Sequence, residues 1–119
     1  MGATYVTVTV RNPAKPERAW EGEFLVDTGA LNSVVPRKHL KAVGIRPHGT
    51  RRFELADGSM VDFDVGGASF EFLGQRTPAY VVFGDDSTEP LLGLTAMEAV
   101  GVQVDPANER LTLLPPQRL

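Results

Sequence analysis

The stretch Phe24-Leu25-Val26-Asp27-Thr28-Gly29-Ala30 determines how the rest of the chain is interpreted. Three apolar residues typical of a β-strand run directly into an acid, a hydroxyl and a glycine. This order predicts that the Asp27 carboxylate ends a buried strand, where it needs a hydrogen bond, a partner charge or a proton. Gly29 allows close backbone approach, and Thr28 can bond a neighbouring backbone group. An ordinary Asx-type turn fits the same residues.

The composition predicts one globular domain spanning residues 1–119. A hydrophobic content of 42% and a charged content of 23% are ordinary for a soluble protein. The chain has no cysteine, which excludes disulfides, thiol nucleophiles and thiolate metal sites. A net charge of −3 gives no reason to expect a nucleic-acid partner. Neither a signal-peptide pattern nor a long apolar run is visible, so we expect a cytoplasmic protein without a membrane partner.

Alternating residues predict a first hairpin. In the segment 4–10 three valines share one face, and 19–26 returns as a second strand after a proline-broken loop at 11–17. Asp57-Gly58 predicts a second hairpin between strands at 50–55 and 60–65. Further strands are expected at 68–73, 77–83, 102–104 and 111–114, with a chain break at Gly66-Gly67. This pattern predicts an all-β, barrel-like domain.

Two short helices are expected, and their sequences repeat one another. Leu40-Lys41-Ala42-Val43-Gly44-Ile45 reads like Met97-Glu98-Ala99-Val100-Gly101-Val102. Each segment follows an apolar run that ends in a glycine turn, Leu25 to Gly29 in the first half and Leu91-Leu92-Gly93 in the second. The two halves therefore look like one strand–turn–helix template used twice, with an acid in the first copy only.

With these features the chain resembles the retropepsin-type aspartic proteases, and more closely the small prokaryotic members of that clan. Three segments carry the resemblance, in the order of the family: Asp27-Thr28-Gly29-Ala30 for the catalytic loop, Ala56-Asp57-Gly58 for the flap tip, and Leu91-Leu92-Gly93 before a helix. Retroviral members carry an acid where this chain has Leu31, so their pocket specificity does not transfer. Ser33 keeps a hydroxyl where the family often has one.

The resemblance implies a retropepsin-like closed barrel of short strands with one or two short helices, assembled as a homodimer. It also implies hydrolysis of peptide or protein substrates by a water held between two Asp27 carboxylates, which share one proton as in other aspartic proteases. Thr28 and Gly29 complete the catalytic loop. Substrate contacts are expected from Ala30 of that loop, from the flap tip, and from the second apolar-glycine motif: Ala56, Asp57, Gly58, Leu92 and Gly93.

Other chemistries find less support in the sequence. His39 and His48 do not form an H-E-x-x-H site, so both are expected at the surface, with no metal and no cofactor. A G-x-S-x-G elbow is absent, which leaves a serine hydrolase unsupported. Two alternatives stay open beside the protease. One is a non-catalytic dimerisation or peptide-binding module that keeps the fold, and the other is an unrelated small barrel with a structural Asp turn.

Overall fold

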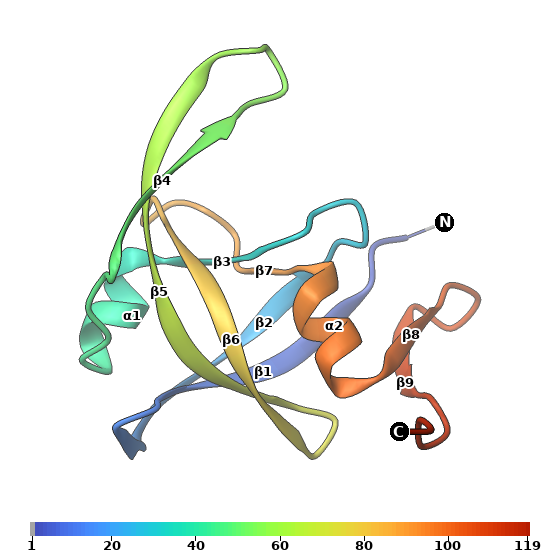
Figure 1. The fold of residues 1–119 in the computed structure, drawn as a ribbon. Coiled ribbons are helices and arrows are strands. Elements are labelled where there is room, and N and C mark those ends of the chain that lie inside the picture. The colour runs from blue at the N-terminus through green and yellow to red at the C-terminus, as the bar shows by residue number, and fades with distance from the viewer. Residues whose placement is uncertain (1) are drawn as a thin grey trace.

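The computed structural model describes residues 2–119, and strands dominate its regular structure, which confirms the predicted β class (Figure 1). In chain order the elements are β1 (Tyr5–Asn12), β2 (Lys15–Val26), β3 (Ser33–Pro36), α1 (Arg37–Ala42), β4 (Gly49–Glu54), β5 (Met60–Phe72), β6 (Gln75–Gly84), β7 (Leu91–Leu92), α2 (Leu94–Val100), β8 (Val102–Asp105) and β9 (Arg110–Leu113).

Seven of these strands form one sheet in the order β1-β2-β7-β3-β6-β5-β4. β1 also pairs with β5, through Thr9 to Arg11 opposite Glu71 to Ser69, so the pairing order returns to its first strand. β4 lies outside this circuit because it pairs with β5 alone. β8 and β9 make a separate two-stranded sheet near the C-terminus.

The core lies inside the circuit of paired strands. The predicted valine face is confirmed, because Val8 and Val10 are fully buried. Phe24 from β2 and Phe70 from β5 pack edge to face with ring centroids 5.7 Å apart, which joins the two strands that flank β1. Both helices add one large buried side chain each, Leu40 and Met97.

The two helices end in the same way. Gly44 follows α1 with a φ of 81°, and Gly101 follows α2 with a φ of 83°. The left-handed conformation is strained for residues with a Cβ atom, so glycine ends each helix at low cost. The apolar residues that come next, Ile45 and Val102, are both buried. The predicted repeat of sequence is therefore a repeat of local structure.

The predicted break at Gly66-Gly67 is wrong. β5 runs without interruption from Met60 to Phe72. A Cβ atom on Gly66 would lie 3.1 Å from the carbonyl oxygen of Arg46, so this glycine lets the 45–48 segment lie close against the strand. Glycine inside a strand can mark such a close approach instead of a strand end.

The loop predicted at 11–17 is also shorter than expected. β1 extends to Asn12 and β2 begins at Lys15, which leaves a two-residue turn. The Asn12 side-chain oxygen accepts hydrogen bonds from the amides of Ala14 and Lys15, at 2.9 and 3.3 Å. An asparagine can bond the backbone of its own turn in this way, and the hairpin therefore continues past the prolines.

His39 differs from its predicted surface position. Its side chain is half-buried and stacks on Trp20, with ring centroids 3.8 Å apart and planes 7° from parallel. Burial, and after it the charge of Lys38, lowers the pKa of the imidazole from its ordinary value. His48 is exposed as predicted. Among residues 2–119, no helix has the length and apolar character needed to cross a bilayer.

Candidate active site

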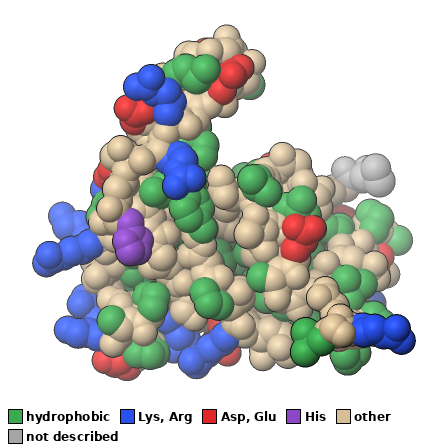
Figure 2. Space-filling view, viewed as in Figure 1, with side chains coloured by type: hydrophobic (Ala, Val, Ile, Leu, Met, Phe, Trp, Pro, Cys, Tyr) green, Lys and Arg blue, Asp and Glu red, His purple; other side chains and the backbone are tan. Residues whose placement is uncertain are grey.

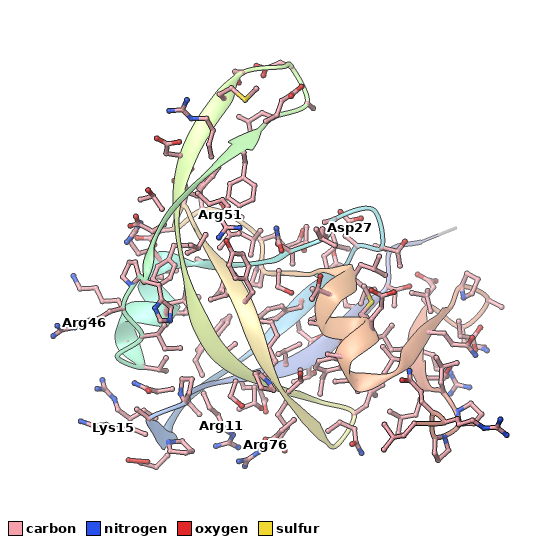
Figure 3. The ribbon with its side chains drawn as sticks, viewed as in Figure 1. Arg11, Lys15, Asp27, Arg46, Arg51 and Arg76 are labelled. Atoms are coloured by element: carbon pink, nitrogen blue, oxygen red, sulfur yellow. The ribbon has the colours of Figure 1, made fainter. Side chains whose placement is uncertain are left out.

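Asp27 lies directly after β2, at the start of the loop that leads into β3 (Figure 3). Its carboxylate Oδ1 accepts a hydrogen bond from the Gly29 amide at 2.9 Å, and its carbonyl accepts one from Ala30 at 3.2 Å. Asp27 itself is half-buried, and Thr28 and Gly29 are exposed. The expectation of a buried strand end is therefore corrected: in one copy of the chain, Asp27 is half-buried and the two residues after it are exposed.

The second apolar-glycine motif holds the Asp27 loop in place. The amide of Asp27 donates to the carbonyl of Leu92 at 3.0 Å, continuing the parallel pairing of Val26 with Leu92. Two further bonds come from the start of α2. The amides of Leu94 and Thr95 donate to the carbonyls of the loop residues Ala30 and Leu31, at 2.8 and 3.1 Å. Segments about 60 residues apart in sequence thus build one rigid support for the acid.

Gly93 makes this contact possible. A Cβ atom at Gly93 would lie 2.5 Å from the carbonyl carbon of Asn32, closer than real side chains come to backbone. The Gly93 amide donates to the hydroxyl oxygen of Ser33 at 2.9 Å. Ser33 is only 2% exposed, so its hydroxyl replaces water as the partner of a buried amide. Sequence analysis noted the Ser33 hydroxyl without giving it this role.

Leu92 was expected to contact substrate, and its side chain is instead fully buried in the core. Its contribution to the site is the carbonyl that receives the Asp27 amide. The large apolar side chain that is exposed in the loop after Asp27 belongs to Leu31, which is 63% exposed. This is the position where retroviral relatives carry an acid.

The predicted second hairpin is formed by β4 and β5, and it projects from the body of the molecule (Figures 1 and 2). At its tip the amide of Gly58 donates to the carbonyl of Leu55, and the amide of Leu55 donates to the carbonyl of Ser59. Gly58 has a φ of 86°, the left-handed conformation predicted for an Asp-Gly turn. The Ser59 hydroxyl, and then its amide, lower the pKa of the Asp57 carboxyl from its ordinary value.

The structure brings some predicted site residues together and leaves others apart. The Asp27 loop and the Leu92-Gly93 motif are in direct contact through backbone hydrogen bonds. The hairpin tip at Ala56-Asp57-Gly58 rises on the same side of the molecule as this loop, with no hydrogen bond between them within residues 2–119 (Figure 1). The part of the chain that the structure describes holds no group of three or more His, Asp or Glu side chains arranged for a metal ion.

Sequence analysis missed one polar pair near the end of β2, formed by Tyr5 and Glu89. Tyr5 faces Leu25 across the β1–β2 pairing, and the Leu25 amide donates to the carbonyl of Pro90. The Glu89 carboxylate, first as an acceptor for the phenol hydroxyl and then by its charge, raises the pKa of Tyr5 from its ordinary value. No motif in the sequence relates the first strand to the acidic 84–89 loop, so only the fold reveals this contact.

The family model described as "Aspartyl protease" matches residues 6–96, from the first valine strand into α2. The chain belongs to the aspartyl protease family. The match includes the Asp27 loop, the projecting hairpin and the Leu92-Gly93 motif, and it removes the alternative of an unrelated barrel with a structural Asp turn. A comparison with curated proteins finds no match.

Solved structures agree with this family at the level of the fold. The solution structure of the simian foamy virus (mac) protease aligns with a TM-score of 0.57 at 19% identity, covering 80% of this chain and 92% of that one. A foamy viral protease-reverse transcriptase, solved in complex with an RNA/DNA hybrid, aligns with a TM-score of 0.60 at 20% identity. That alignment covers 81% of this chain and 12% of the viral chain. The fold of this aspartyl protease family member is retropepsin-like.

Proposed function

We propose that this chain is an aspartic endopeptidase whose active site forms where two copies meet. The observation that carries the proposal is the placement of Asp27: a half-buried acid whose amide is bonded to the Leu92 carbonyl and which is followed by two exposed residues, Thr28 and Gly29. Asp27-Thr28-Gly29 occurs once in the sequence, so one chain supplies one acid. A two-fold contact would bring the two Asp27 side chains to one axis.

In this arrangement the paired carboxylates would hold one proton between them. The ionised one takes a proton from the attacking water, and the protonated one polarises the carbonyl of the peptide bond. Thr28, which is exposed and without a hydrogen bond to its hydroxyl within residues 2–119, would bond across to the partner's loop, as the resemblance implies. Gly29 and Ala30 would leave room for the peptide, with Ala56, Asp57 and Gly58 closing over it.

The free strand edges are suited to such an assembly. The first half of β1, from Tyr5 to Val8, pairs with β2 alone, and β9 pairs with β8 alone. Leu113 and Leu114 are exposed beside the second of these edges. These residues could pair with a second copy and bury apolar surface, which is the main source of stability in a permanent interface.

A peptide-library cleavage assay tests this function. Wild-type protein should cleave, a statine-type inhibitor should block it, and sedimentation should show a dimer. Asp27→Asn should lower turnover by about 10²–10⁴-fold because the general base is lost. Asp85→Asn, the same change in the exposed 84–89 loop, is the matched control and should retain full activity. Cleavage that persists in Asp27→Asn, or full activity in a monomer, would overturn the proposal.

The alternative function is a peptide-binding or dimerisation module that keeps the fold without catalysis. The same assay separates the two functions. Inactive wild-type protein that still dimerises and still binds a library peptide would favour the module. The exposure of Leu31, an apolar residue in the loop after Asp27 where retroviral relatives carry an acid, is the observation that favours testing this second function.

A further inference from the structure

A groove lies apart from the Asp27 loop, between the β1–β2 turn, the 46–51 segment and the strands β5 and β6. Its volume is about 770 Å³, within the range of ligand sites in proteins. The floor is formed by small and apolar residues, among them Gly67, Ala68 and Pro78. None of residues 27–30 lines it, so the groove is separate from the site described above.

The charge of this groove is opposite to that of the whole chain. Arg51 and Arg76 line it together with His48, and no Asp or Glu is among its lining residues. Lys15 lies between two lining prolines in the sequence. Figure 3 shows Arg11, Lys15, Arg46, Arg51 and Arg76 around this part of the molecule, with Asp27 away from them. A protein of net charge −3 therefore gathers cations here.

Two contacts fix these cations in place. The guanidinium of Arg51 lies over the ring of Tyr80, 5.5 Å from its centroid, which leaves the charge available to a ligand. Glu71, outside the groove lining, is shared by Arg11 at 3.1 Å and Arg76 at 3.4 Å. Two arginines and one glutamate leave one positive charge at that end of the groove.

Within the groove, and among residues 2–119, one edge of β5 carries no paired strand over three residues. β4 pairs with β5 as far as Val65, and β1 pairs with it from Ser69 onward. Between them, Gly66 to Ala68 pair with β6 only. The 45–48 segment already lies against Gly66 from this side, so Gly67 and Ala68 are left as the backbone that a ligand main chain can bond.

We propose that this groove docks an extended acidic segment of a polypeptide. The backbone at Gly67 and Ala68 would bond the main chain of that segment, the apolar floor would receive its side chains, and Arg51 and Arg76 would pair with its carboxylates. Strand addition and an apolar floor favour a peptide over a nucleic acid, whose recognition rests on phosphate charge and base stacking. The site acts in addition to the catalytic loop and does not depend on catalysis.

Fluorescence anisotropy with a labelled octapeptide of alternating glutamate and leucine tests the proposal. Asp27→Asn protein is used so that the probe stays intact whether or not the chain is a peptidase. Affinity should fall about tenfold in Arg51→Glu, and it should fall as salt is raised because charge pairs are screened. Arg118→Glu makes the same charge change at the exposed C-terminus and should leave the affinity unchanged.

Gly67→Val fills the groove from its floor. A Cβ atom at Gly67 would meet only the His48 ring, at 3.8 Å, so the strand accepts the change while the added side chain blocks the peptide. Thermal melts should match the parent protein while binding is lost. The proposal is overturned if both groove variants bind normally, or if a peptide with lysine in place of glutamate binds equally well. It is also overturned if only an oligonucleotide binds, or if the variants alter sedimentation but not peptide binding.

Discussion

The amide of Gly93 donates to the hydroxyl of Ser33 across 2.9 Å, in the interior between β7 and β3. This bond joins the glycine that ends the second apolar motif to the residue that ends the Asp27 loop. Both copies of the repeated strand–turn–helix template therefore meet next to Leu92, whose carbonyl accepts the hydrogen bond of the Asp27 amide.

Ser33→Ala should lower the free energy of unfolding by about 1–3 kcal/mol, because the Gly93 amide loses its partner while remaining buried. Urea denaturation measures the change. Ser87→Ala is the matched control, since Ser87 lies exposed in the acidic loop and should tolerate the substitution. Equal stability of the two variants would show that the buried bond contributes little.

Gly93→Ala should lower the free energy of unfolding by about 1–3 kcal/mol and also reduce peptide turnover. The added methyl would overlap the Asn32 backbone and push the Asp27 loop out of position. Gly49→Ala is a suitable control, because no atom lies within 4 Å of a Cβ at that glycine. Thermal melts and turnover are measured on both variants, and a fully active Gly93→Ala would contradict the close packing described here.

Gly58→Val should reduce peptide turnover with little effect on the melting temperature. A φ of 86° is strained for a β-branched residue, at a cost of about 1–3 kcal/mol that falls on the hairpin tip alone. Gly58→Asn should restore much of the turnover, since asparagine tolerates this conformation. If Gly58→Val has normal turnover, residues 55–59 form an ordinary surface hairpin without a part in catalysis.

His39 should make the fold less stable in mild acid. Burial lowers the pKa of its imidazole in the folded protein below the ordinary 6.5, with Lys38 acting in the same direction and Asp86 opposing. The unfolded chain then binds this proton more readily. The stability contribution is therefore fully present above pH 6.5 and is lost as pH falls through the lowered folded value.

His39→Phe keeps a flat ring for stacking on Trp20 and removes the titrating group. Its free energy of unfolding should vary less between neutral and mildly acidic pH than that of the wild type. Denaturant titrations over this interval make the comparison. Parallel pH profiles for the two proteins would show that the stacked imidazole does not couple protonation to folding.

Local sequence signals predicted the elements that local chemistry determines. The valine alternation, the Asp57-Gly58 turn and the repeated strand–turn–helix template are all found as expected. Gly66 was misread because its small size serves a contact with the 45–48 segment, and no short window of sequence contains both partners. The full burial of Leu92 and the stacking of His39 are tertiary effects of the same kind.

The candidate site was predictable to a similar extent. The Asp27 loop and the apolar-glycine motif were identified from their sequences, and the fold places them in contact. The supporting role of Leu92 was not predicted. Its side chain lies in the core and its carbonyl receives the Asp27 amide because β7 pairs in parallel with β2. The groove between β5 and β6 had no sequence signal, since its lining comes from four separate segments of the chain.

The outer side of β4 has a consequence for solubility. This strand pairs with β5 alone, so its other edge presents unpaired backbone groups along the projecting hairpin. Such an edge invites the strands of other molecules to stack onto it and start aggregates. Arg51, Arg52 and Glu54 occupy half of its six positions, and exposed charges of this kind resist stacking between copies. The charged side chains of β4 therefore protect the exposed edge of the projecting hairpin against aggregation.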